Sequence, residues 1–96
     1  MLGLEEVEKL LKENKEHLFQ EYPIKELAIF GSVARKEATE ESDIDILVEF
    51  SEPIGFEIVD LVEELETLLD HKVDLVSKKA IRPRLMSYIT KDLVYV

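Results

Sequence analysis

The sequence predicts an α/β (α+β) fold in which a small mixed sheet is flanked by helices. Apolar residues recur at helical spacing in two long segments, and short apolar runs typical of strands lie between the helical segments. Gly, Pro and polar turns separate these elements. A chain of 96 residues has room for one hydrophobic core, so we expect a single domain over residues 1–96.

Each expected element follows from its own pattern. The two long helices carry apolar residues every three or four positions, and Pro23 ends the first of them. The strands are short apolar runs, Pro53 and Gly55 mark a loop, and Pro83 suits the first turn of a short helix. The expected helices cover residues 4–21, 32–38, 56–69 and 82–89, and the expected strands cover residues 24–30, 43–50, 72–77 and 93–96. This order is typical of parallel βαβ units, but pattern alone leaves the strand directions open.

Composition excludes several classes of function. The chain contains no cysteine, which excludes disulfides and thiolate zinc sites, and no apolar run is long enough to span a membrane. The net charge is −10, with six basic and twenty acidic residues in 1–71 and six basic and two acidic residues in 72–96. An acidic body repels a nucleic-acid backbone and suits cations or a basic protein partner. We expect a cytoplasmic protein that does not bind nucleic acid directly.

Residues 30–48, FGSVARKEATEESDIDILV, contain the densest group of candidate functional residues. Gly31 and Ser32 lie where a strand passes into a helix, where free amides and the helix dipole attract anions. Gly31 lets a backbone approach a phosphate, and the Ser32 hydroxyl can donate to one. The alternative is that Ser32 only caps the helix.

Three aspartates follow on two expected strands. Alternation places Asp43 and Asp45 on one face of the second strand, with their backbones about 6–7 Å apart. Asp74 occupies the equivalent face of the third strand and joins them if the two strands are neighbours. Such a cluster favours a cation, and oxygen ligands suit magnesium beside substrate phosphates. The alternative is that all three are solvated surface acids.

Taken together, GSVAR, SDIDILV and VDLVS resemble the minimal nucleotidyltransferases, relatives of DNA polymerase β, and the resemblance covers nearly the whole chain. It implies that Gly31 and Ser32 hold the triphosphate of ATP. It also implies that Asp43, Asp45 and Asp74 are catalytic and bind two Mg²⁺ ions, which activate the incoming hydroxyl and clamp the leaving oxygen. Arg35 would orient phosphate or, equally, form a salt bridge.

The chain departs from the family at Lys36, where relatives often carry Gly; a lysine here narrows the space or adds positive charge near the nucleotide. Small members of the family resemble antitoxins that attach AMP to a tyrosine of a HEPN ribonuclease toxin, releasing pyrophosphate. Alternatives are an antitoxin that acts by occlusion alone, and transfer to a small hydroxylated molecule.

His17 and His71 lack a ligand pattern and are assigned to no metal. The basic cluster Lys78, Lys79, Arg82 and Arg84 is interpreted as a solvated loop, with the triphosphate or a partner as alternatives.

Overall fold

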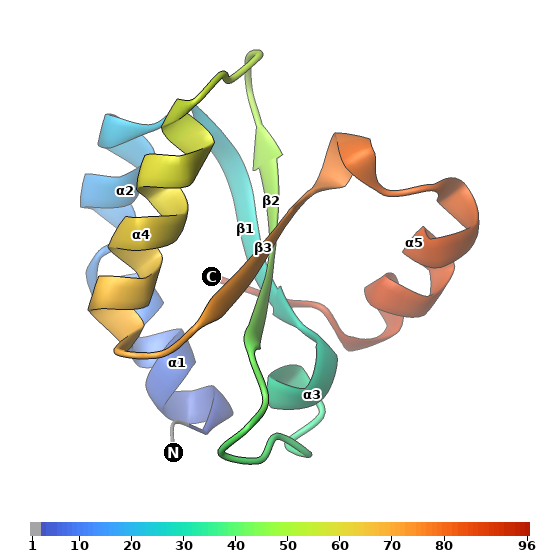
Figure 1. Ribbon diagram of the computed structural model, residues 1–96. Coiled ribbons are helices and arrows are strands. Elements are labelled where there is room, and N and C mark those ends of the chain that lie inside the picture. The colour runs from blue at the N-terminus through green and yellow to red at the C-terminus, as the bar shows by residue number, and fades with distance from the viewer. Residues whose placement is uncertain (1–2) are drawn as a thin grey trace.

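The computed structural model describes residues 3–96 and contains a four-stranded mixed sheet flanked by helices, as expected (Figure 1). Met1 and Leu2, the first two residues of the expected domain, lie outside the described residues. The elements are α1 (Leu4–Glu13), α2 (Lys15–Glu21), β1 (Ile24–Phe30), α3 (Gly31–Ala34), β2 (Ile44–Phe50), α4 (Glu57–Leu69), β3 (Val73–Ser77), α5 (Pro83–Ile89) and β4 (Val94–Tyr95). Two short 3-10 turns, Lys78–Ala80 and Thr90–Asp92, flank α5. Within the described range, no helix is both long and apolar enough to cross a membrane.

The strands are arranged in the order β3-β2-β1-β4. β2 is antiparallel to β1 and parallel to β3, and β4 is antiparallel to β1. The sequence pattern had left these directions open. Among the described residues, only the step from β2 through α4 to β3 is a parallel crossover, so the repeated βαβ arrangement that the element order also suggested does not form there.

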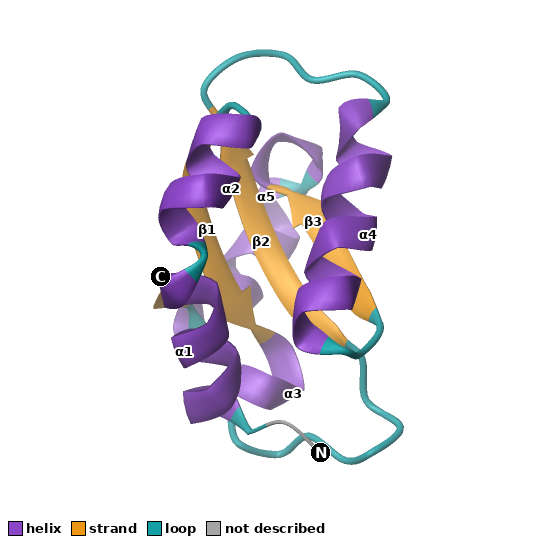
Figure 2. Ribbon diagram, turned by 90° about the vertical axis from the view of Figure 1, so that its left-hand side faces the viewer, coloured by secondary structure: helices purple, strands orange, loops and turns teal. Residues whose placement is uncertain are grey.

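The core lies between the sheet and the layer formed by α1, α2 and α4 (Figure 2). Ile44, Ile46 and Val48 of β2 are buried in it, together with Leu61 and Leu65 of α4. Because side chains alternate along a strand, Asp45 and Glu49 face the opposite side of the sheet. That side carries α5 (Figure 1), and it is the face on which the predicted site is built.

The first expected helix is wrong as a single element, because it divides at Asn14 into α1 and α2. Asn14 leaves the helical conformation, and its side-chain amide Nδ2 donates to the carbonyl of Leu10 at 2.9 Å. Asparagine side chains compete with the helical backbone in this way. Residues on both sides of the break keep an apolar side toward the sheet, including Leu11 and Leu18, so the apolar pattern stays continuous through it.

The second expected helix, residues 32–38, is also wrong in its bounds, because α3 ends at Ala34. Lys36 has a φ of 60°, in the left-handed region. Its N–H donates to the carbonyl of Val33 at 3.0 Å, and the N–H of Glu37 donates to the carbonyl of Ser32 at 2.8 Å. This is a Schellman motif with lysine at the position where glycine is usual. The lysine that replaces the usual glycine of the family at position 36 therefore has to adopt a backbone conformation that glycine favours.

Candidate functional site

The parallel pairing of β2 and β3 brings two of the predicted aspartates side by side. Asp45 and Asp74 are directly opposite in the register, which confirms that the third strand lies beside the second. Asp43 immediately precedes β2 rather than lying within it, and its charge still acts on Asp45. The three acids therefore form one electrostatic group at one end of β2.

The pKa of Asp45 is raised from 3.8 to about 6. Partial burial is the main cause, and the negative charges of Asp74 and then Asp43 add to it, whereas Arg35 acts in the opposite direction. A carboxyl in this condition is stabilised by any positive charge that replaces its proton. The donor set, three carboxylates with no nitrogen or sulfur, suits a hard divalent cation such as Mg²⁺.

Gly31 lies against the same carboxylate. It has a φ of 72°, a conformation that a residue with a side chain rarely adopts. A Cβ at this position would overlap Asp45 Oδ2 and lie 2.9 Å from Asp45 Cγ. From the sequence, a glycine at position 31 was expected because a phosphate must approach the backbone closely. The structure shows a second requirement for glycine that does not involve a ligand. The glycine makes room for the carboxyl of Asp45 and turns the chain from β1 into α3.

Ser32 is the second residue of α3 and does not cap it. The cap position belongs to Phe30, and no side chain there bonds to the helix. The alternative explanation of Ser32 as a helix cap is therefore wrong. The first amides of a helix have no partner within it, so Ser32 adds a hydroxyl to a group of donors that follows β1 directly and lies close to Asp45.

Arg35 makes the salt bridges that sequence analysis had offered as the alternative to phosphate binding. Its Nε donates to Glu37 Oε2 at 3.3 Å, and its Nη1 donates to Asp92 Oδ2 at 3.4 Å. These bonds raise the pKa of Arg35 further above its ordinary value. The side chain is 43% exposed, so both bridges are open to solvent and easily exchanged for another anion.

The basic cluster of the last quarter of the chain is spread over the 3-10 turn and the start of α5. Lys78 Nζ lies 3.6 Å from Glu49 Oε1. Lys79, Arg82 and Arg84 are exposed. Their exposure agrees with the interpretation as a solvated segment, but Lys78, Lys79 and Arg84 lie in helical turns and not in a loop.

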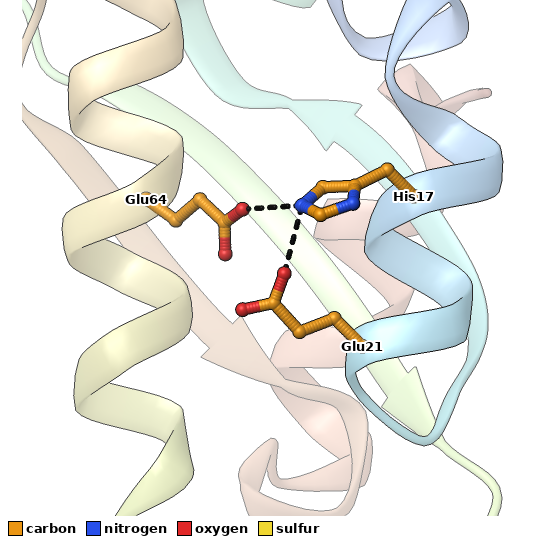
Figure 3. A group of neighbouring side chains, drawn as sticks. All are labelled: His17, Glu21 and Glu64. Carbon is orange, nitrogen blue, oxygen red and sulfur yellow. Dashed lines mark hydrogen bonds and ion pairs between the residues drawn. The ribbon is translucent and has the colours of Figure 1, made fainter.

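One group of side chains was missed by the sequence analysis. Across residues 3–96, the group of three potential metal ligands whose ligand atoms lie within 4.8 Å of one another is His17, Glu21 and Glu64, not the three aspartates (Figure 3). His17 and Glu21 are spaced four apart on α2, which was a readable signal. Glu64 reaches them from α4, which no local pattern could reveal.

Comparison with known proteins agrees with this geometry. The model of the family described as "Nucleotidyltransferase domain" matches residues 7–96. Protein adenylyltransferase MntA of Thermococcus cleftensis is 41% identical over 97 residues, which span 100% of this chain and 98% of that protein. A solved structure assigned to the minimal nucleotidyltransferases is 34% identical, with a TM-score of 0.75, and the match covers 97% of this chain and 95% of that one.

A more distant match shares the fold alone. It is the complex of a tri-AMPylated HEPN toxin from Shewanella oneidensis with its MNT antitoxin, at 21% identity and a TM-score of 0.66 over 91% of this chain and 69% of that one. The resemblance to minimal nucleotidyltransferases is thus confirmed by sequence and by fold. The chain belongs to the nucleotidyltransferase domain family and is a nucleotidyltransferase.

Proposed function

We propose that this chain is an antitoxin that transfers AMP from ATP to a tyrosine hydroxyl of a HEPN-domain toxin. The observation that carries the proposal is the pairing of Asp45 with Asp74 beside Gly31, within a chain of this family. The name of the Thermococcus cleftensis relative supports a protein as the acceptor. The fold shared with the Shewanella oneidensis complex supports a HEPN toxin as that protein.

In the proposed reaction the tyrosine oxygen attacks the α-phosphorus of ATP. A bond forms between that oxygen and phosphorus, the bond from phosphorus to the bridging oxygen of the β-phosphate breaks, and pyrophosphate leaves. The proton of the tyrosine hydroxyl passes to solvent water in the same process. The product is a tyrosine ester of AMP.

Some residues of this chain would bind the nucleotide, and others would bind the cation. Ser32 and the first amides of α3 would donate to the triphosphate, and Arg35 would exchange a carboxylate partner for phosphate. Asp43, Asp45 and Asp74 would hold Mg²⁺, with two ions expected. When bound, magnesium supplies positive charge to the attacking and leaving oxygens. The raised pKa of Asp45 supports this role, because a bound cation would offset the burial and the repulsion by Asp74 and Asp43 that disfavour its charged form.

The test is an incubation of the chain with ATP, Mg²⁺ and the product of its neighbouring gene, followed by intact mass measurement of both proteins. We expect the toxin to gain the mass of one or more AMP units, on tyrosine when the product is mapped by peptide sequencing. The double variant Asp43→Asn/Asp45→Asn should transfer nothing while still folding. Asp60→Asn, a charge change on α4 away from the aspartates, is the matched control and should transfer normally.

Three outcomes would overturn parts of the proposal. A stable complex in which the toxin is silenced without added mass would establish occlusion instead of chemistry. Transfer to a small hydroxylated compound, with no mass gained by the toxin, would replace the acceptor. Retained transfer by the double variant would remove Asp43 and Asp45 from the catalytic group.

A further inference from the structure

A second cluster of ligating side chains lies on the helical layer, away from the aspartates. His17 and Glu21 lie on α2 and Glu64 on α4, and all three side chains point toward one another (Figure 3). His17 Nε2 lies 2.8 Å from Glu21 Oε2 and 3.0 Å from Glu64 Oε1. We propose that this cluster is a site for a transition-metal ion, with Zn²⁺ as the expected occupant.

The ligand set matches the chemistry of such ions. Zn²⁺ takes imidazole nitrogen together with carboxylate oxygen, in four-coordinate sites that water can complete. Its bonds of about 2.0–2.2 Å place tetrahedral neighbours roughly 3.3–3.6 Å apart, so the imidazole and the carboxylates must separate by about half an ångström. Magnesium, in contrast, prefers oxygen ligands alone. The cluster therefore differs in ion preference from the aspartates on the opposite side of the sheet.

The surroundings of the cluster support a built site. The hydroxyl of Tyr22, a buried residue, donates to Glu64 Oε2 at 2.9 Å, which leaves Glu64 Oε1 turned toward His17. A hydrogen bond to the second oxygen of a ligating carboxylate is the usual way in which outer groups orient metal ligands.

The cluster is also accessible and lies in a negative field. The side chain of His17 is 64% exposed, that of Glu21 42% and that of Glu64 30%. The groove between α2 and α4 that His17 and Glu64 line also contains Asp60 and Glu63. These acids attract cations to the groove. A bound ion would join α2 to α4, two helices that pack on the same face of the sheet.

The competing explanation is a simple ion pair, in which a protonated His17 bridges two carboxylates. Exposed pairs of this kind contribute little to stability, and they bind no metal. The two explanations therefore differ in a direct measurement.

We would titrate the tag-free full chain with ZnCl₂ by calorimetry in excess Mg²⁺, added to saturate the proposed aspartate site, and record the absorption of the Co²⁺ form. We expect one Zn²⁺ per chain, a tetrahedral Co²⁺ spectrum, and a rise in melting temperature that EDTA reverses. His17→Ala and Glu64→Gln should lower the affinity for Zn²⁺ by tenfold or more, and Tyr22→Phe by about tenfold. Glu21→Gln should also weaken binding, whereas the matched change Glu16→Gln, on the same helix, should not.

No uptake of Zn²⁺, or uptake that is unchanged in both His17→Ala and Glu64→Gln, would overturn the proposal and leave the ion pair as the role of the cluster. Circular dichroism of each variant separates loss of the site from loss of the fold. We expect His17→Ala to transfer AMP normally, because none of the ligands of the proposed zinc site belongs to the aspartate group. Failure of the metal site and failure of the proposed function are thus distinguishable.

Discussion

Replacing Asp45 with asparagine should stabilise the protein when no divalent cation is present. The carboxyl of Asp45 is partly buried and repelled by Asp74 and Asp43, and these effects raise its pKa from 3.8 to about 6. At about 1.4 kcal/mol per pKa unit, the shift corresponds to roughly 3 kcal/mol at most. Solvent screening at this half-buried position reduces the expected gain to about 1–2 kcal/mol. Asparagine removes the charge and keeps the size of the side chain.

The sign of the effect depends on pH. Because the folded state binds the Asp45 proton more tightly than the unfolded state, the contribution of Asp45 to the stability falls as pH rises from about 4 to about 6, and then levels off. Asp45→Asn has no ionisable group at this position, so its stability does not show this loss. The advantage of the variant should therefore be small near pH 4 and fully present above about pH 6.

The assay is urea unfolding followed by circular dichroism in EDTA, at several values between about pH 4 and pH 8. A gain of 1 kcal/mol corresponds to about 4–8 °C in melting temperature for a chain of this size. Glu40→Gln, which removes one charge from an exposed turn, is the control and should show no such pH-dependent gain. Added Mg²⁺ should stabilise the unmodified chain more than Asp45→Asn. A variant that is less stable at pH 8, or equally stabilised at pH 4 and pH 8, would refute the electrostatic explanation.

Substitutions at three positions test the segment between β1 and β2. Gly31→Ala should cost about 1–3 kcal/mol in the free energy of unfolding, because of its positive φ and the overlap with Asp45, and should lower AMP transfer; normal stability in urea would contradict this. Lys36→Gly should stabilise the protein by about 1 kcal/mol, because glycine adopts the left-handed backbone conformation without strain, whereas Lys36→Ala should give no gain. An equal gain from both variants would show that backbone strain is not the cause. Arg35→Gln should change stability by less than about 1 kcal/mol but raise the KM for ATP. An unchanged KM would leave Arg35 with only its salt bridges.

Much of the architecture was predictable from local pattern. Alternation in β2 and the apolar stripe of α4 are strong signals, and their bounds in the structure, Ile44–Phe50 and Glu57–Leu69, differ from expectation by one residue at most. The placement of Asp45 beside Asp74 needed one further condition, that β2 and β3 be neighbours. The structure meets that condition through the α4 crossover.

The remaining features depend on conformations or contacts that a local pattern does not encode. The break at Asn14 leaves the apolar stripe intact, so spacing cannot reveal it. The left-handed backbone at Lys36 ends α3 with a residue that is ordinary inside a helix. The partnership of Glu64 with His17 spans 47 positions along the chain and follows only from the packing of α2 beside α4.

The alternation of β2 also bears on how faithfully the chain must fold. The same strand supplies Ile44, Ile46 and Val48 to the core and Asp45 to the opposite face. A slip of one residue against β1 or β3 would exchange these two sets, burying an acid and exposing the aliphatic side chains. Errors in pairing would therefore abolish stability and activity together. A molecule with this error would expose aliphatic side chains and aggregate, so it would not persist as an enzyme of low activity.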